Sequence, residues 1–426
     1  MGNDERDLCG SLFVYHGDMK EKQEQNFIVI GGGASGLTAA IAAGRAAAAH
    51  HRFVRIIVLE ASRRIGHSIL RSGNGRCNFS RLAIDAGSYH SSSFVRRAFD
   101  ALDADGDIPS VLDWFSDLGL VWTCRHEDGG LLYPYSNKSS SVLDVLRFAL
   151  DALAVEVRVE TSVAGVEKQG SRYRVVLDDA TTLDADAVFV GVGGRISPRL
   201  LKQVSFVESR PVLGALKTDT TNLKGMNGTR VRAKVALPDR GIVETGEVLF
   251  REYGVSGIAV FNISRHARKG DRLTIDLVPD RTHDELEHFL EDRFVRLKPC
   301  ATLDFLRGFL LEPVALAVLR SAGLPPAVPF GQHLIGSLAY ALKNFSLRVE
   351  GIADPGNCQV HRGGIAVDHV EPSTMEVIAS PGLYVMGEAL DVDGPCGGYN
   401  LHWAWTSGLL AGNAAVRRLP DEGRRS

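Results

Sequence analysis

The chain has few cysteines, no recognisable metal-binding pattern and no long apolar run. Its six cysteines are scattered over 426 residues without a CxxC pair, so neither a structural zinc site nor a thioredoxin-like centre is predicted. Thirteen histidines include no HExxH motif, and we predict no metal site. No apolar segment approaches the roughly 18–20 residues that span a bilayer, and the polar segment Asn3–Asp7 is unlike a secretory signal. We therefore expect a cytoplasmic protein that contacts no membrane.

The chain also lacks an excess of positive charge. Its 48 Lys and Arg residues oppose 51 Asp and Glu residues, which gives a formal net charge of −3. General nucleic-acid binders usually carry a basic excess, so this balance argues against nucleic acid as a partner. The polar residues 1–25 are expected to be a disordered lead-in, with Met19 as an alternative start. The remaining length is sufficient for two or three domains.

Glycine, in contrast, is abundant, and the strongest local pattern is a glycine fingerprint near the N-terminus. The apolar run Phe27–Ile30 predicts a buried strand, and the Ala-rich segment Leu37–Ala49 predicts a helix. Between them stands a G-x-G-x-x-G pattern, in which Gly31 permits a tight turn and Gly33 allows close approach of a pyrophosphate. Gly36 allows the helix to pack closely on the strand. Free backbone N–H groups at the helix start then bind the phosphates.

A second strand and an acidic residue follow the fingerprint. The segment Val54–Leu59 predicts the strand, and Glu60 stands 24 residues after Gly36. That offset is typical of the carboxylate that binds the ribose hydroxyls of a dinucleotide. The order of strand, glycine turn, helix, strand and acid therefore predicts a Rossmann-type site. It leaves FAD and NAD both open, because both place adenosine diphosphate there.

Further glycine-rich segments extend the pattern to the C-terminus. They include Ser72–Asn78, which reads SGNGRCN, and a segment that reads GGYNLHWAWTSG and begins at Gly397. The chain resembles the bacterial NAD(P)/FAD-dependent oxidoreductase family that includes BaiN-like bile-acid reductases, and four blocks carry the resemblance: Ile28–Gly36, Gly66–Asn78, Gly246–Arg265 and Gly382–Gly412. The resemblance extends from about residue 26 to the C-terminus.

The resemblance implies an α/β fold with a discontinuous FAD-binding domain of the Rossmann type. This domain is expected over 26–200 and 350–420, with a β-rich, barrel-like domain inserted at 201–278 and a helical domain at 279–349. Within the helical part, the apolar periodicity predicts helices over His283–Leu297, Thr302–Leu310 and Ala327–Leu342.

The resemblance also implies which residues bind FAD. The fingerprint holds the pyrophosphate, Glu60 the adenosine ribose, and Ser72–Asn78 the isoalloxazine side. Glu388 is expected near the pyrophosphate–ribityl region, and a helix that begins at residues 398–401 directs its N-terminus toward the N1–C2=O edge of the flavin. There it stabilises negative charge on the reduced ring. The expected FAD-binding residues are Gly31, Gly33, Ala34, Ser35, Gly36, Glu60, Gly66, Ser72, Gly73, Gly75, Arg76, Cys77, Asn78, Gly193, Gly387, Glu388, Gly398, Tyr399, Asn400 and Leu401.

The catalytic residues are not identified by the pattern; the candidates are Arg251, Tyr253 and Tyr399. The chain also departs from the family pattern. His67 and Ser68 stand where two lysines are usual, and Arg251 and Glu252 replace a Thr-His pair. These departures affect the substrate side of the site rather than the FAD side.

Several residues have both a functional and a structural interpretation. Cys77 and Cys396 are either a redox-active pair or small buried residues beside the cofactor. Trp403 and Trp405 either stack on flavin or substrate or, more often for such a helix, pack into the core. His402 is a further candidate beside the expected helix start.

The favoured function is an FAD-dependent oxidoreductase that transfers hydride through flavin N5 to or from an organic small molecule. By resemblance, an activated C=C bond is a candidate acceptor. No second G-x-G-x-x-G is visible, so NAD(P)H is expected only as a transient reductant. Two alternatives stay open: an FAD-binding protein without catalysis, and a flavoprotein that acts on RNA. The oligomeric state is not predicted.

Overall fold

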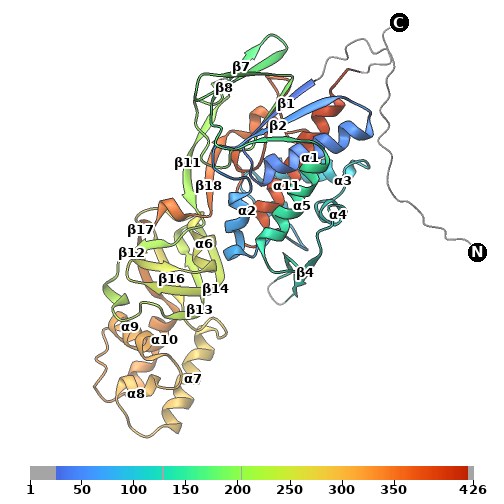
Figure 1. The fold of residues 1–426 in the computed structure, drawn as a ribbon. Helices are drawn as coiled ribbons and strands as arrows, with labels where there is room; N and C mark the ends of the chain where they lie inside the picture. The colour runs from blue at the N-terminus through green and yellow to red at the C-terminus, as the bar shows by residue number, and fades with distance from the viewer. Residues whose placement is uncertain (1–24, 127–128, 203, 421–426) are drawn as a thin grey trace, which may run out of the picture.

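The computed structural model describes residues 25–420 apart from 127–128 and 203. Figure 1 shows an elongated molecule with a large α/β domain at one end, a β-barrel in the middle and a group of helices at the other end. Except for Gln25, the expected lead-in lies outside the described residues. No helix in the described part of the chain is long and apolar enough to cross a membrane.

The α/β domain is organised around a seven-stranded sheet. Five of its strands are parallel, and two short antiparallel strands extend one edge, in the order β19-β20-β21-β10-β1-β2-β6. The parallel strands are β1 (Gln25–Ile30), β2 (Val54–Leu59), β6 (Glu156–Arg158), β10 (Ala187–Val190) and β21 (Leu383–Val385); the antiparallel pair is β19 (Val370–Glu371) and β20 (Glu376–Val377). The central strands are buried on both faces, as their β-branched and aromatic residues require. Ile30 pairs with both Leu59 and Val190, so these strands end at one edge.

Two helices from opposite ends of the sequence pack side by side on this sheet. They are α1 (Ala34–Ala49) and α11 (Tyr399–Arg417), and Gly408 and Gly412 of α11 lie against the backbone of α1. Figure 1 shows α1 and α11 adjacent, in blue and red. The N- and C-terminal segments therefore build one domain.

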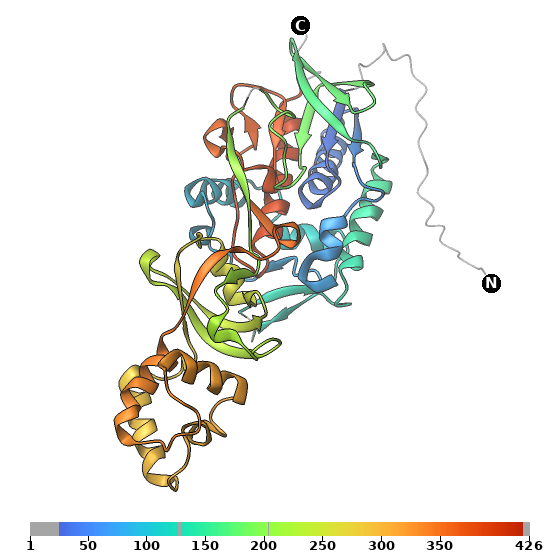
Figure 2. The ribbon, with the colours of Figure 1, turned by 90° about the vertical axis from the view of Figure 1, so that its left-hand side faces the viewer.

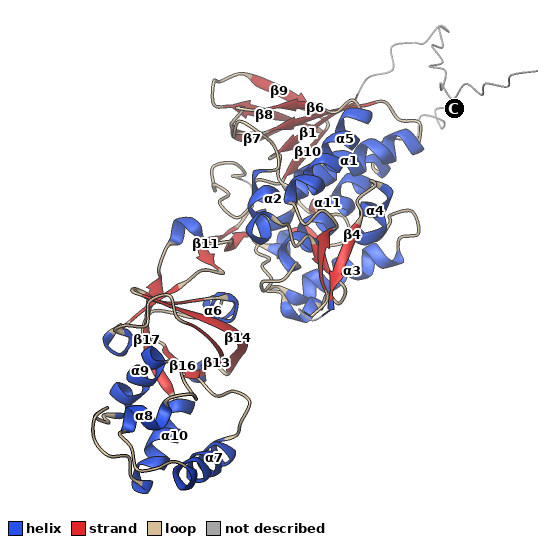
Figure 3. Ribbon diagram, turned by 60° about the horizontal axis from the view of Figure 1, so that its bottom comes forward, coloured by secondary structure: helices blue, strands red, loops and turns tan. Residues whose placement is uncertain are grey.

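Smaller elements complete the α/β domain. They are α2 (His67–Arg71), α3 (Ser92–Ala104), α4 (Val111–Asp117), α5 (Ser139–Ala152), a sheet of β3 (Ser80–Arg81), β4 (Trp122–Arg125) and β5 (Leu131–Pro134), and a meander of β7 (Val163–Gln169), β8 (Arg172–Leu177) and β9 (Thr182–Ala185). Figure 3 shows helices lying along the sheet.

A two-stranded ribbon leads from this domain to a closed barrel. The ribbon pairs β11 (Phe206–Val212) with β18 (Val360–Ile365). The barrel strands are β12 (Leu216–Thr218), β13 (Arg230–Leu237), β14 (Ile242–Arg251), β15 (Gly254–Ser256), β16 (Arg272–Asp276) and β17 (Phe345–Ile352). The short helix α6 (Ile258–Ser264) packs on β14. Figure 2 shows the barrel between the other two parts.

The last group of helices is inserted between β16 and β17. It contains α7 (His283–Arg296), α8 (Thr302–Leu306), α9 (Glu312–Ala322) and α10 (Ile335–Lys343). α7 begins at a capping box in which Thr282 and Glu285 bond reciprocally. These helices share one apolar core with the barrel, so barrel and helices form one unit.

The mixed α/β class with a barrel-like insert is confirmed by the sheet and barrel topology. The expected helix Ala327–Leu342 was partly wrong, because the helix starts only at Ile335 and the preceding segment is bridged to Ala301 through Pro329. The helix Glu312–Ala322 was not predicted, although Pro313 in its first turn is compatible with a helix start. Strand β17 crosses the boundary expected at residue 349 and closes the barrel.

Candidate functional site

The turn between β1 and α1 leaves no room for side chains at two of its glycines. Gly31 has φ +103°, and a Cβ atom there would lie 2.5 Å from the Gly191 carbonyl oxygen. A Cβ atom on Gly36 would lie 1.9 Å from the Gly31 carbonyl oxygen. Because real Cβ contacts are never this short, the turn can form only with glycine at both positions.

The start of α1 has the properties of an anion-binding site. The helix begins at Ala34 after Gly33, no side chain caps it, and its first turn contains no acidic residue. The first N–H groups of a helix have no intrahelical partner, and the helix dipole favours negative charge beside them. A Cβ atom on Gly33 would have no neighbour closer than 3.5 Å. Gly33, Ala34 and Ser35 therefore present backbone donors that fit a pyrophosphate.

Glu60 is held at this same turn. It follows β2, and its Oε2 accepts a hydrogen bond from the Gly32 N–H at 2.8 Å. Its Oε1 accepts hydrogen bonds from the Ser62 N–H at 2.8 Å and from the Ser62 hydroxyl. Gly66, which starts α2 with φ +73°, donates its N–H to the Gly32 carbonyl at 2.7 Å. The structure thus brings Glu60 and Gly66 to the fingerprint.

The segment Ser72–Asn78 forms a tight loop with several left-handed residues. Gly73, Gly75 and Cys77 have φ of +54°, +80° and +57°. The Ser72 carbonyl accepts the Cys77 N–H at 3.1 Å, and the Ser72 hydroxyl donates to the Ile69 carbonyl at 2.6 Å. Arg76 donates from Nε to the Gly73 carbonyl at 3.3 Å. The loop is therefore fixed by its own backbone.

The C-terminal segment contributes the opposite side of the site. Gly387 follows β21 with φ +60°, and a Cβ atom there would lie 2.8 Å from Ser35 Oγ. Its carbonyl accepts the Trp403 indole N–H at 3.0 Å, and its N–H donates to Ser407 Oγ at 3.0 Å. Residues of α11 therefore hold Gly387 against the first turn of α1.

Glu388 lies next to the end of β10. A Cβ atom on Gly194 would be 3.3 Å from Glu388 Oε2, and the neighbouring Gly193 has φ +75° with open space around its Cβ position. Burial and, to a smaller extent, the charge of Asp393 raise the pKa of Glu388 to about 7, against the opposing effect of the Gly194 N–H. Glu388 therefore has a pKa near neutral pH at this edge of the sheet.

The start of α11 lies beside the Ser72–Asn78 loop. Gly398 precedes the helix with φ +92°, and a Cβ atom there would lie 2.6 Å from the Ser80 carbonyl and 3.1 Å from the Asn78 side-chain amide. The first turn has no acidic residue and no side-chain cap. A second helix N-terminus is thus available to an anionic group.

The expected residues of this turn have identifiable contacts. The guanidinium carbon of Arg81 lies over the Tyr399 ring, 5.0 Å from the ring centroid. The Tyr399 carbonyl accepts a hydrogen bond from the Tyr89 hydroxyl at 2.7 Å. Asn400 accepts the Gly394 N–H at 2.8 Å and donates to the Gly394 carbonyl at 2.9 Å. Leu401 packs against the core of the α/β domain. Asn400 therefore fixes the preceding turn.

Arg251 and Tyr253 lie on the barrel, at the turn between β14 and β15. Arg251 ends β14, and Tyr253 stands in the turn before β15, with its side chain 38% exposed. The Tyr253 carbonyl accepts the Thr218 N–H at 3.0 Å, and Glu252 accepts from Asn227 at 3.1 Å. In residues 25–420 with their gaps, no hydrogen bond joins either residue to the glycine-rich loops. Of the three catalytic candidates, only Tyr399 belongs to them.

For the residues that allowed both a functional and a structural interpretation, the contacts favour the structural one. Cys77 and Cys396 are free thiols, and burial raises the pKa of both to about 12, so neither is a thiolate. Trp403 and Trp405 are buried and donate their indole N–H groups to backbone carbonyls. Burial lowers the pKa of His402 to about 4, which leaves it neutral, with Nδ1 2.8 Å from Ser80 Oγ.

The sequence reasoning missed a buried ionic cluster at the junction of the domain and the barrel. The carboxylate of Asp393 is fully buried and bound by the guanidinium groups of Arg265 and Arg362. Asp393 and Arg265 both stand in segments that the resemblance had marked. The only available signal was that charged residues occur in otherwise apolar, glycine-rich segments.

Comparison with known proteins finds a matching family and relatives that align with most of this chain. Residues 25–414 match the family described as HI0933-like protein Rossmann domain. A 3-dehydro-bile acid delta(4,6)-reductase from Clostridium scindens is 33% identical, over 85% of this chain and 93% of the relative. A ribosomal RNA dihydrouridine synthase from Escherichia coli is 28% identical, over 83% of this chain and 90% of the relative. The solved structure of a 3-ketosteroid-delta4-(5alpha)-dehydrogenase from Rhodococcus jostii is 14% identical with a TM-score of 0.45, covering 93% of this chain and 98% of that one.

Proposed function

This chain belongs to the HI0933-like family of Rossmann-domain proteins, and from that membership we propose that it is an FAD-dependent oxidoreductase. The observation that carries the proposal is the composite edge at which both ends of the chain meet. There, the glycine-rich turn Gly31–Gly36 lies against Gly387, and a second helix start at Gly398 lies against the Ser72–Asn78 loop. A ligand with an anionic centre and two different ends fits such an edge.

The roles of the residues follow from their positions. The first turn of α1 holds the pyrophosphate with backbone N–H groups, and Glu60 accepts hydrogen bonds from the adenosine ribose. The N-terminus of α11 and the Ser72–Asn78 loop hold the ring end of the cofactor. When bound, FAD supplies hydride transfer at its N5 atom. The helix dipole of α11 favours negative charge at that end, so it promotes reduction.

We infer that the substrate is an organic small molecule whose C=C bond is activated by a neighbouring carbonyl group. The names of the two relatives, a delta(4,6)-reductase and a dihydrouridine synthase, both describe addition of hydrogen across a C=C bond. The lack of a second dinucleotide fingerprint favours NAD(P)H as a reductant that binds transiently.

RNA is the alternative substrate, because one relative is named for a ribosomal RNA modification. The near-balanced charge of this chain, −3 overall, supports a small molecule instead, since RNA-binding proteins carry a basic surface. His67 and Arg251 depart from the family pattern, which supports a substrate for this chain that differs from those of its relatives.

The decisive experiment is an absorption spectrum of the purified protein in the near-ultraviolet and visible range, followed by anaerobic addition of NADH or NADPH. Twin flavin bands that bleach with one nucleotide would support the proposal and identify the donor. Bands that persist would favour a binding protein or another reductant. Absence of bands after incubation with FAD would overturn the proposal. A reducible enone and a uridine-containing RNA, offered to the reduced protein, would then separate the two substrate classes by which one reoxidises the flavin.

A further inference from the structure

The carboxylate of Asp393 is shared by two arginines from different parts of the chain. Arg362 binds it through two parallel hydrogen bonds, Nε to Oδ1 at 2.6 Å and Nη2 to Oδ2 at 2.9 Å. Arg265 donates from Nε to Oδ2 at 2.7 Å. Asp393 has no exposed surface, and Arg265 is 6% exposed. Such a fully desolvated pair is costly to break from one side, because the remaining charge stays buried.

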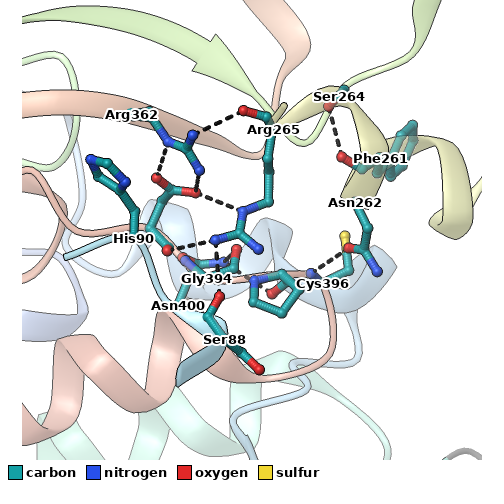
Figure 4. Close-up of polar contacts among 12 residues, drawn as sticks. Ser88, His90, Phe261, Asn262, Ser264, Arg265, Arg362, Gly394, Cys396 and Asn400 are labelled. Atoms are coloured by element: carbon teal, nitrogen blue, oxygen red, sulfur yellow. Dashed lines mark hydrogen bonds and ion pairs between the residues drawn. The ribbon is translucent and has the colours of Figure 1, made fainter. Parts of the chain in front are cut away.

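The three residues come from three structural units. Asp393 stands between β21 and α11, Arg362 lies on β18 of the ribbon, and Arg265 ends α6 on the barrel. Figure 4 shows Arg265 and Arg362, whose guanidinium groups bind this carboxylate, approaching from these separate segments. The cluster therefore joins the barrel to the α/β domain.

Arg265 makes further connections beyond the carboxylate. Its Nη2 donates to the Asp393 carbonyl at 2.9 Å and to the Ser88 carbonyl at 3.1 Å. Its own carbonyl, at the C-terminus of α6, accepts hydrogen bonds from Arg362 at 3.0 Å and from Arg210 at 3.1 Å. Both the side chain and the backbone of Arg265 are thus fixed to residues outside the barrel.

Further contacts hold the turn that follows Asp393 from the barrel side. Asn262 of α6 accepts the Cys396 N–H at 2.9 Å. The apolar side chains of Cys396 and Phe261 pack with ribbon residues in a small separate cluster. The turn Gly394–Gly398 is therefore in direct contact with α6.

The same turn is held from the α/β side. Asn400 bonds both the N–H and the carbonyl of Gly394, and His90 donates its N–H to the Asp393 carbonyl at 2.8 Å. Contacts on both sides leave the turn little freedom. The position of the barrel and the position of the α11 start are therefore coupled through a few atoms.

We propose that Arg265 is a positioning residue: through Asp393 it fixes the barrel against the turn Gly394–Gly398, and it thereby sets the start of α11 that faces the reacting end of the cofactor. The cofactor part of this inference rests on the proposed function, whereas the coupling of barrel and turn does not. Arg265→Met tests it, because this substitution keeps most of the side-chain length and removes the charge and the donors.

The chain offers a matched control in Arg240→Met. Arg240 is also an arginine that binds an aspartate carboxylate, through Nε and Nη2 at 2.7 and 2.9 Å, but both residues belong to the barrel. In the protein without FAD, we expect Arg265→Met to accelerate amide hydrogen exchange over residues 391–398 by about tenfold or more. Arg240→Met is expected to leave exchange in that segment at the wild-type rate.

With FAD bound, the same variants are compared by the visible absorption bands and the midpoint potential of the flavin. Arg265→Met is expected to shift the bands and lower the potential, because a less ordered helix start stabilises the reduced ring less. Arg240→Met is expected to change neither. A structural role confined to folding would change thermal stability and leave the spectrum and potential of the folded protein unchanged.

The proposal is overturned if exchange over 391–398 in Arg265→Met equals that in Arg240→Met. Should Arg265→Met fail to fold, Arg265→Lys decides: it keeps the charge opposite Asp393 and loses the contacts with Ser88. Exchange over 391–398 faster than in Arg240→Met, together with a band shift relative to the wild type, would support the proposal, and wild-type values of both would overturn it. If the wild-type protein binds no FAD, the proposed function fails, and the exchange measurement still tests the coupling.

Discussion

The carbonyl oxygen of Ser35 lies 2.7 Å from the point that a Cβ atom on Gly408 would occupy. Ser35 belongs to the first turn of α1 and Gly408 to the middle of α11, so the two helices touch through backbone at the fingerprint itself. This contact joins the N- and C-terminal segments of the chain into one dinucleotide-binding edge. It also makes the geometry of that edge sensitive to a single methyl group.

Gly408→Ala is therefore expected to push α11 away from α1. The added Cβ would also lie 2.7 Å from Thr38 Cβ, and overpacking of this kind costs about 1–3 kcal/mol. Urea or thermal unfolding measures the loss. Gly106→Ala is the control, because Gly106 is exposed and a Cβ atom there meets nothing within 4 Å. Equal stability of the two variants would contradict the close contact.

Gly36→Ala is expected to abolish FAD binding, since its Cβ atom would meet the Gly31 carbonyl oxygen at 1.9 Å and open the turn. We expect the affinity for FAD to fall at least about 100-fold, equivalent to about 2.7 kcal/mol. Titration with FAD, followed by quenching of flavin fluorescence, gives the affinity. Gly44→Ala makes the same change within α1, where the nearest neighbour is the Leu153 side chain at 3.1 Å, and should bind FAD normally.

Glu60→Gln is expected to weaken FAD binding by about 10–100-fold, because hydrogen bonds to a charged group contribute about 1.5–3 kcal/mol. The carboxylate accepts from Gly32 and Ser62 on one side, and the amide of Gln would present a donor where an acceptor is required. The exposed Glu160 offers the control substitution Glu160→Gln. If both variants bind FAD as the wild type does, Glu60 does not hold the ribose.

Glu388 predicts a pH dependence of stability in the protein without FAD. Its pKa is raised in the folded state from 4.5 to about 7, so between these values the folded state binds more protons than the unfolded state. Stability from this group therefore falls as pH rises through that window, and the loss persists above pH 7. Glu388→Gln removes the titration.

We expect Glu388→Gln to match the wild type near pH 4.5 and to exceed its stability above pH 7 by on the order of 1–2 kcal/mol. This stability difference is smaller than the full pKa shift of Glu388 implies, since its side chain is only partly buried. Thermal unfolding at several pH values provides the comparison. A constant difference between the two proteins across the pH range would show that folding does not raise the pKa of Glu388.

The local pattern of the sequence was enough to predict the fingerprint. The glycine spacing, the apolar strand before it and the acid after the second strand are features of consecutive residues, and the structure has β1, α1, β2 and Glu60 in that order. The contact that excludes a side chain at Gly31 comes from Gly191, far along the chain, whereas at Gly36 the constraint comes from the Gly31 carbonyl, only five residues away. Short-range sterics of this kind can be read from a single sequence.

The long-range arrangement could not be predicted in the same way. Only the tertiary structure decided that β17 closes the barrel, that Arg251 and Tyr253 belong to the barrel, and that Asp393 is buried. A charged residue in sequence gives no sign of its partner when that partner comes from another structural unit. Arg265 and Arg362 meet Asp393 because the ribbon, α6 and the turn before α11 converge in space, and desolvation then makes the ion pairs obligatory.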